Sequence, residues 1–177
     1  MWHLRTIQIF LLALILTTCK KSNTEIPFPS HYSGTATVEK NGMLWTAYPF
    51  AAVNPRVKNT LNIGLDSLDA FRTLWEKIAL LTVPTVPGTY PVLTNDLQER
   101  DPIVGASLLY TEADLVYGYY GVLIADSSSF VTLLSYDTIS REIIGTFELT
   151  MIAFNKPYPS APDTIRLRNG KFNTKVL

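Results

Sequence analysis

The stretch Ile143-Ile-Gly-Thr-Phe-Glu-Leu-Thr-Met-Ile-Ala153 divides into two alternating sets of side chains. Successive side chains of a β-strand point to opposite faces, so each set would occupy one face of a strand. Such a strand packs its more apolar face on a core and shows the other at least partly to water. The first set is Ile143, Gly145, Phe147, Leu149, Met151 and Ala153, and the second is Ile144, Thr146, Glu148, Thr150 and Ile152.

Short segments rich in Val, Ile, Thr, Tyr and Phe occur along the rest of the chain, and turn residues separate them. This spacing predicts a single all-β domain over residues 34–177, an antiparallel β-sandwich or partly closed β-barrel of about 8–10 strands. The expected strands are 35–40, 43–48, 60–65, 74–83, 103–111, 117–125, 130–136, 143–153, 164–168 and 171–176.

Two Asn-Gly pairs stand between expected strands, Asn41-Gly42 near the start of the domain and Asn169-Gly170 near its end. Both residue types tolerate the positive φ angles that a tight two-residue turn requires. The sequence therefore predicts a tight hairpin at each pair.

Residues 68–79 are compatible with two structures. Their apolar residues fall at helical spacing, with Ser67 as a possible cap. The run from Ile78 to Val83 is β-like, however, and it ends in the turn-rich segment Pro84–Gly88. We therefore expect a loop or single helical turn that leads into a strand from Leu74 to Val83. The helical set is Leu68, Phe71, Leu74, Trp75, Ile78 and Ala79.

The amino terminus has the pattern of a secretory signal peptide. Arg5 supplies a positive charge, and the apolar run Ile7–Leu16 is interrupted only by Gln8. As a helix this run would cover about 15 Å, about half of a bilayer core, which is too short to span it. Residues 1–18 are therefore predicted to be a signal peptide, and the alternative is a buried apolar terminal helix.

The sequence Leu16-Thr17-Thr18-Cys19 resembles the lipobox of bacterial lipoproteins, with Thr18 where Gly, Ala or Ser is usual. The resemblance implies that Cys19 becomes the first mature residue and carries acyl chains such as palmitate. Two or more such chains give stable membrane attachment. Residues 19–33 are then a flexible tether, polar at first and interrupted by Pro27 and Pro29.

Several motifs occur in a fixed order along the body of the chain: Asn41-Gly-Met-Leu-Trp-Thr-Ala47, Leu61-Asn-Ile-Gly-Leu65, Trp75-Glu-Lys-Ile-Ala-Leu80 with Gly88-Thr-Tyr90, Ile144-Gly-Thr-Phe-Glu-Leu-Thr150, Pro162-Asp-Thr-Ile-Arg166 and Asn169-Gly-Lys-Phe172. Together they resemble a family of small uncharacterised Bacteroidetes lipoproteins that carry a domain of unknown function. The resemblance covers most of residues 34–177. It implies a β-rich domain that is lipid-anchored in the cell envelope of a diderm bacterium, at the outer membrane, and it carries over no catalytic residues.

The composition argues against several functional classes. Lys+Arg and Asp+Glu are balanced at 15 each, so the basic field that nucleic-acid binding usually needs is missing. His3 and Cys19 fall in the first twenty residues, which leaves His31 as the only imidazole in the rest. A His/Cys zinc site, a Cys nucleophile, a disulfide framework and a CxxC redox motif are therefore excluded from the body. No glycine-rich phosphate-binding motif occurs, and we expect no cofactor.

Carboxylates are the most abundant candidate acids and bases. Glu112 and Asp114 lie two residues apart and would share a face of a continuing strand, as in a glycosidase-like or metal-binding pair, but an exposed strand end or turn is the favoured interpretation. Asp96, Glu99 and Asp101 offer oxygen ligands suited to calcium. Their spacing matches no calcium loop, so a solvated loop is the favoured interpretation. We therefore predict no catalytic residue and no metal site among the carboxylates.

The serine run Ser127–Ser129 would need a base beside a hydroxyl to act as a nucleophile. His31 belongs to the expected tether, is far away in sequence and is expected to be mobile. A hairpin loop is therefore the preferred interpretation of the serines.

Tyrosines gather in the expected strands between residues 103 and 136. Exposed tyrosine rings offer a flat apolar area and a polar tip, which suits sugars or peptides. Tyrosine is also simply a good strand former that covers core edges. Strand alternation places Tyr117 and Tyr119 on one face and Tyr120 on the other. The possible ligand platform is Tyr110, Tyr117, Tyr119, Tyr120 and Tyr136, whereas Trp45, Trp75, Phe147 and Phe172 are expected in the core.

The leading functional hypothesis is a lipid-anchored envelope lipoprotein, facing the periplasm or the cell surface, with a non-enzymatic role in binding a small ligand, glycan or partner protein. One alternative is a structural or assembly component of the envelope without a small-molecule ligand. The least favoured is a carboxylate- or metal-dependent hydrolase. Tyrosine rings around a concavity would favour the binding role, whereas rings buried in the core would favour the structural role. Three or more carboxylates in a cleft would favour the hydrolase.

Overall fold

The computed structural model describes residues 30–93, 102–112, 115–122 and 128–177. The predicted signal peptide, Cys19 and the first part of the tether lie outside the described residues. The described chain is all-β, with ten antiparallel strands in one sheet. The strands are β1 (Thr35–Lys40), β2 (Met43–Val53), β3 (Thr60–Leu68), β4 (Leu74–Pro84), β5 (Gly88–Pro91), β6 (Gly105–Glu112), β7 (Leu115–Val122), β8 (Phe130–Tyr136), β9 (Glu142–Asn155) and β10 (Thr164–Lys175). Among these residues no helix has the length and apolar character needed to cross a membrane.

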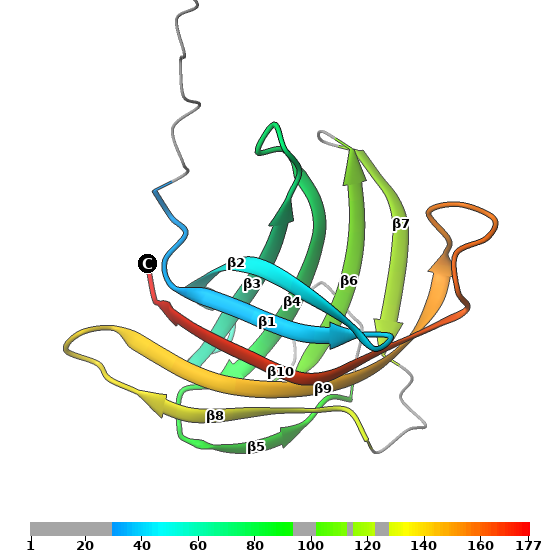
Figure 1. The fold of residues 1–177 in the computed structure, drawn as a ribbon. Helices are drawn as coiled ribbons and strands as arrows, with labels where there is room; N and C mark the ends of the chain where they lie inside the picture. The colour runs from blue at the N-terminus through cyan, green and yellow to red at the C-terminus, as the bar shows by residue number, and fades with distance from the viewer. Residues whose placement is uncertain (1–29, 94–101, 113–114, 123–127) are drawn as a thin grey trace, which may run out of the picture.

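The sheet closes on itself. Its order is β10-β1-β2-β3-β4-β6-β7-β9-β8-β5, and β10 also pairs with β9. β9 pairs with β10 along one edge, while its other edge pairs with β8 at its start and with β7 at its end. In Figure 1, β1, β10 and β9 run side by side in front of β3, β4, β6 and β7. The predicted all-β architecture, an antiparallel sandwich or partly closed barrel of about 8–10 strands, is therefore confirmed.

Two aromatic rings occupy the core where the sheet closes. Phe147 on β9 and Phe172 on β10 are 1% and 2% exposed, and their rings stack with centroids 6.5 Å apart. They pack directly on glycines, because a Cβ atom at Gly145 would lie 2.2 Å from Phe172 Cζ and one at Gly170 would lie 2.7 Å from Phe147. Both predicted core aromatics are confirmed, and the two glycines are needed for close approach.

The two Asn-Gly pairs have different structures. Asn41 and Gly42 have φ angles of 51° and 81° and form the predicted tight turn between β1 and β2. The second predicted hairpin is wrong, because β10 runs without interruption from Thr164 to Lys175. Asn169, with φ 55°, forms a bulge at which the register against β9 jumps from Leu167 to Gly170. Both halves of β10 pair with β9 and β1, so the chain continues instead of reversing.

The ambiguous stretch before Val83 forms a turn and a strand. The Asp69 side chain accepts hydrogen bonds from the backbone N–H groups of Phe71 and Thr73, at 2.8 Å each, and β4 begins at Leu74. The strand prediction is confirmed. The expectation that Trp75 lies in the core is wrong, because its side chain is 46% exposed and the next residue, Glu76, is the one that is buried.

The two ends of the rolled sheet differ. One end, which we call the open end, holds the β1–β2 and β3–β4 turns, the β9–β10 loop, and the paired end of β6 and start of β7. The chain enters β1 and leaves β10 at the opposite end, as Figure 1 shows. The segment that precedes β1 therefore joins the sheet at the end opposite the open end.

β2 and β3 pair over only part of their lengths. Residues Tyr48–Val53 pair with Leu61–Asp66, whereas Met43–Ala47 of β2 pair only with β1. In Figure 1, β2 turns away from β3 and β4 beyond the paired part. This divergence, which we call the β2–β3 gap, leaves the barrel partly open at its open end.

Candidate binding site at the open end

The predicted tyrosine platform is divided between the core and the surface. Tyr110 and Tyr120 are 6% and 0% exposed, and their rings lie 5.9 Å apart. The Tyr120 hydroxyl donates a hydrogen bond to the Pro162 carbonyl at 2.8 Å. Burial raises the pKa of both hydroxyls, so they stay protonated near neutral pH. These two tyrosines are core residues and not an exposed platform.

The other three tyrosines have separate environments. The Tyr117 ring lies 6.4 Å from Tyr110 and 6.2 Å from Trp75, whereas the Tyr119 ring lies 5.4 Å from Phe154. The expectation that Tyr117 and Tyr119 share a face is not met, because the β6–β7 register shifts between Tyr110 and Thr111 and makes Tyr117 an extra residue. Tyr136 packs on the core at the opposite end of the barrel. The five tyrosines thus form no single surface.

The remaining predicted candidates do not come together. Glu112 is exposed at the end of β6, and Ser129 is buried, where its hydroxyl accepts a hydrogen bond from the Thr150 N–H at 2.9 Å. The Ser128 hydroxyl lies 3.3 Å from that of Thr150. Among the described residues no group of three or more His, Cys, Asp or Glu is placed to hold a metal ion. Asp96, Glu99, Asp101, Asp114 and Ser127 lie outside the described residues.

The open end contains a cavity of about 390 Å³, within the range of small-ligand pockets. It lies on the inner side of the β2–β3 gap and combines aromatic, aliphatic and charged side chains. Residues from the β1–β2 hairpin, the start of β4, the end of β6, the β9–β10 loop and the start of β10 line it. They are Lys40, Asn41, Met43, Leu44, Trp45, Glu76, Tyr110, Tyr158, Pro162 and Ile165.

Glu76 is the chemical centre of this open-end cavity. Its Oε2 atom accepts hydrogen bonds from Lys40 Nζ at 2.6 Å and from Trp45 Nε1 at 2.8 Å. Lys40 Nζ also lies 4.9 Å from the centre of the Tyr110 ring, a favourable cation–π distance. The charges of Lys40 and Glu76 compensate each other, so the site carries no net charge from this pair.

Glu76 retains hydrogen-bonding capacity. Both of its bonds use Oε2, and Oε1 accepts none from the described residues. A carboxylate can accept bonds at both oxygens, so a donor inside the cavity can reach Oε1. The site can therefore bind an uncharged group that donates a hydrogen bond and has an apolar surface for the surrounding rings.

Sequence reasoning missed this site, although a signal for it was present. Lys40 follows Ala36 and Val38 at alternate positions, and Glu76 precedes Ile78 and Leu80 in the same way. Alternation therefore places both charges on the inner face of the sheet, where an isolated charge is costly. The sequence does not show that the two charges meet.

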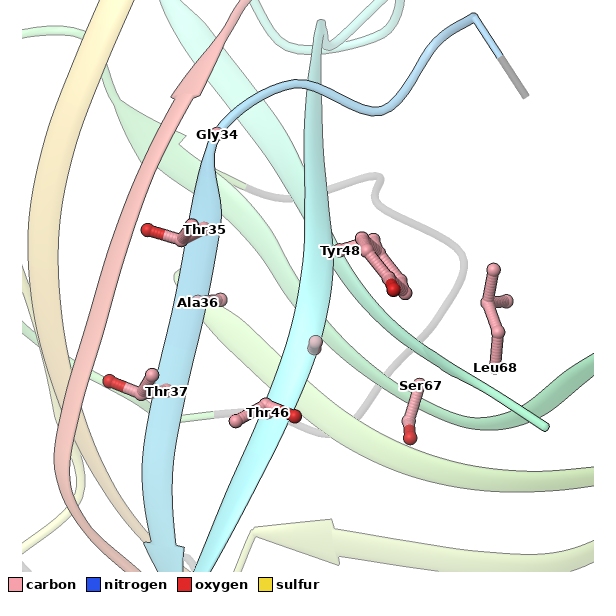
Figure 2. Close-up of a pocket in the computed structure, with 9 residues that line it drawn as sticks. Gly34, Thr35, Ala36, Thr37, Thr46, Tyr48, Ser67 and Leu68 are labelled. Carbon is pink, nitrogen blue, oxygen red and sulfur yellow. The ribbon is translucent and has the colours of Figure 1, made fainter. Parts of the chain in front are cut away.

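A second cavity, of about 340 Å³, lies on the outer side of the same gap. Figure 2 shows Thr35 and Thr37 on β1, Thr46 and Tyr48 on β2, and Ser67 at the end of β3 around it. Its lining is more polar in residue type than that of the open-end cavity and contains no charged side chain. The β2–β3 gap is thus flanked by a cavity on each face.

The end of the expected tether packs on the outer face of β2, β3 and β4. The Tyr32 hydroxyl donates a hydrogen bond to Asp66 Oδ2 at 2.7 Å, and Lys77 Nζ lies 3.8 Å from Asp66 Oδ1. The His31 ring meets Phe50 edge-on at a centroid distance of 5.4 Å. His31 is therefore an ordered part of the domain surface, which corrects the expectation that it is mobile.

The buried Asp66 carboxyl is expected to make stability depend on pH. Burial raises the pKa of Asp66 above its ordinary 3.8, although Lys77 and the Tyr32 hydrogen bond oppose this shift. The folded protein then holds this proton more tightly than the unfolded chain. The stabilisation from protonated Asp66 is present at low pH and is lost as pH rises from 3.8 through the folded-state pKa.

We therefore expect the Asp66→Asn variant to gain stability relative to wild type as pH rises from about 3 to about 7. Asparagine keeps an oxygen that can accept the Tyr32 hydrogen bond. Urea unfolding across this pH range measures the difference, with the exposed Asp163→Asn as the matched control. A wild-type protein that gained relative stability with rising pH would contradict the assignment.

Comparisons with known proteins give no relative. No family model matches the chain, and no curated protein or solved structure is detectably similar to it.

Proposed function

We propose that this protein is a lipid-anchored envelope lipoprotein that binds a small ligand, glycan or partner protein at its open end, without catalysing a reaction. In this proposal residues 1–18 are removed, Cys19 is acylated, and the tether attaches the domain to the outer membrane. The resemblance of Leu16-Thr17-Thr18-Cys19 to a lipobox supports the anchor, and so does the resemblance of the motif order to that of Bacteroidetes lipoproteins. The chain enters the domain opposite the open end, so such an anchor leaves the open end accessible.

The open-end cavity is the main support for a binding role. It contains a nearly buried carboxylate with one oxygen, Glu76 Oε1, that accepts no hydrogen bond from the described residues. Large apolar side chains are exposed around the same end, which is a common feature of binding surfaces. They include Met43, Leu44, Phe71, Trp75, Leu115 and Tyr158, with exposures from 46% to 77%.

The binding role is tested with glycan and peptide arrays probed with the purified full chain. Tyr158 is half-exposed at the cavity, so the Tyr158→Ala variant is expected to bind a positive probe about tenfold more weakly. Ile139→Ala is the matched control, because Ile139 is 94% exposed in the β8–β9 turn at the opposite end. No binding on either array, or equal effects of the two variants, would contradict binding at the open end.

A structural or assembly role is the second candidate. The burial of Tyr110 and Tyr120 favours it, because these rings fill the core instead of forming an exposed platform. Silence on both arrays would favour this role.

The proposed anchor has its own test. Cys19→Ala is expected to abolish incorporation of labelled fatty acid and to shift the protein out of the membrane fraction, because no acylation site remains. Metabolic labelling and membrane fractionation measure both effects, with Ser22→Ala as the control variant. A Cys19→Ala protein that incorporates label and stays in the membrane fraction as wild type does would refute lipidation at this residue.

A further inference from the structure

The backbone of β2 has unpaired groups beside the β2–β3 gap. In an antiparallel pair, alternate residues direct both backbone groups to the same partner strand. The two-residue turn at Asn41-Gly42 makes Lys40 and Met43 a bonded pair, so Trp45 and Ala47 also bond to β1. Leu44 and Thr46 therefore direct their N–H and C=O groups away from β1, into the gap.

No described strand pairs with these groups. The β2–β3 ladder begins at Tyr48, which pairs with Asp66, and no backbone hydrogen bond from another described segment reaches Leu44 or Thr46. Both residues are exposed, Leu44 to 74%. We call the backbone of Leu44–Thr46 the free edge of β2.

The free edge lacks the features that usually protect a sheet edge. Prolines, charges and short strands are the common means of preventing edge-to-edge pairing. β5, at the end of the strand order, has such protection, because it spans only Gly88–Pro91 and follows Pro87. The free edge of β2 has neither a proline nor a charged residue between Met43 and Ala47.

We infer that the free edge of β2 binds an extended segment of a partner protein by strand addition. This inference rests on the binding role proposed above and names the class of partner for it. An extended polypeptide presents N–H and C=O groups at the spacing that Leu44 and Thr46 require. Its side chains point alternately to the two faces of the sheet. One set enters the open-end cavity beside Trp45 and Glu76, and the other enters the outer cavity beside Thr46.

The two cavities limit which side chains the partner segment can carry. Lys40 and Glu76 already compensate each other, so inward side chains are uncharged, and a hydroxyl or amide among them can donate to Glu76 Oε1. The outer cavity, lined by threonines and Tyr48, accepts small polar or β-branched side chains. The partner segment is thus an uncharged strand of alternating character.

The geometry of the gap argues against a second copy of the folded domain as its occupant. β3 borders its far side at Ser67 and Leu68, so the edge of a second folded copy would bring its own β3 into the same space. The amino-terminal segment of this chain is poorly suited to pair with the free edge of β2. Pro27 and Pro29 lie two residues apart, so in an extended segment they face the same neighbouring strand, and neither has a backbone N–H to donate to it.

The test uses fluorescent octapeptides with threonine at alternate positions, valine, leucine, tyrosine or asparagine between them, and lysine at both ends. We expect at least one to bind the full chain and to protect the Leu44 and Thr46 amides from hydrogen exchange. Thr46→Pro removes one edge N–H and is expected to weaken binding at least about tenfold, because the proline ring also obstructs the edge. Thr46→Ala keeps the N–H and removes only the side-chain contact in the outer cavity, so it is expected to lose clearly less affinity than Thr46→Pro.

A second measurement does not depend on how Thr46→Pro folds. Methylation of the peptide amides that face β2 is expected to abolish binding to wild-type protein, whereas methylation of the alternate amides is not. Equal effects of the two methylation patterns, or equal binding by Thr46→Pro and Thr46→Ala, would overturn strand addition.

The remaining outcomes separate this inference from the proposed function. Glycan or small-ligand binding with no peptide binding would overturn strand addition and leave the binding role intact, whereas no binding of any probe would overturn both. Protection of the Leu44 and Thr46 amides without peptide would assign the edge to the chain's own amino terminus. Protection that grows with protein concentration would assign it to a second copy, and either result overturns the inference.

Discussion

Replacement of Glu76 with alanine is expected to lower the free energy of unfolding by about 3 to 5 kcal/mol. The Lys40 side chain is 17% exposed and the Glu76 side chain 10%, so the variant leaves a largely buried ammonium group without its counter-charge. The Trp45 indole N–H also loses its acceptor. Urea unfolding of the full chain measures the loss.

Two further variants separate the ion pair from simple truncation. Lys40→Met combined with Glu76→Leu removes both charges and fills similar volume, so it is expected to remain within about 2 kcal/mol of wild type. Glu39→Ala removes an exposed carboxylate from the neighbouring position and is expected to cost no more than about 0.5 kcal/mol. If Glu76→Ala and Glu39→Ala had equal effects, the Lys40–Glu76 pair would have no structural importance.

Replacement of Phe172 with alanine is expected to destabilise the fold by about 3 to 5 kcal/mol. The ring is 2% exposed, lies over the position where Gly145 has no side chain, and stacks with Phe147. Removal of the ring leaves a cavity where β9 and β10 close the sheet, and the strands cannot collapse into it because both are paired on each edge.

The controls for Phe172 use the same strand. Lys171→Ala changes an exposed neighbour and is expected to be nearly neutral, within about 0.5 kcal/mol, while Phe172→Leu should give an intermediate loss because it fills part of the cavity. Thermal and urea unfolding measure the series. A cost for Phe172→Ala equal to that of Lys171→Ala would show that this closure does not depend on ring packing.

The local pattern of the sequence predicted much of the fold. The alternation in Ile143–Ala153 gave a long strand with a buried face, and Asn41-Gly42 gave a tight hairpin, because both signals depend on neighbouring residues alone. The second Asn-Gly pair shows where local reasoning fails. Asn169 takes the positive φ that its residue type allows, but pairing with β9 on one side and β1 on the other makes it a bulge.

The candidate site was less predictable than the fold. The tyrosine set rests on the clustering of tyrosines in the expected strands, and alternation predicts a shared face for Tyr117 and Tyr119. A register shift between Tyr110 and Thr111 moves Tyr117 away from the face of Tyr119. A one-residue bulge moves the side chains beyond it to the opposite face of the sheet. The sequence of a single strand does not show where such a bulge lies. Burial of Tyr110 and Tyr120 likewise depends on which strands cover them.

By itself, the sequence determined that this protein is built from short antiparallel strands, with a distinct amino-terminal segment that ends at its only cysteine. These properties depend on side-chain periodicity and composition, which are local. Only the tertiary structure brought Lys40 of β1 to Glu76 of β4 and separated β2 from β3 beyond Tyr48. The contact joins strands that β2 and β3 separate along the chain, and the separation depends on the twist and closure of the whole sheet, so neither follows from a local pattern.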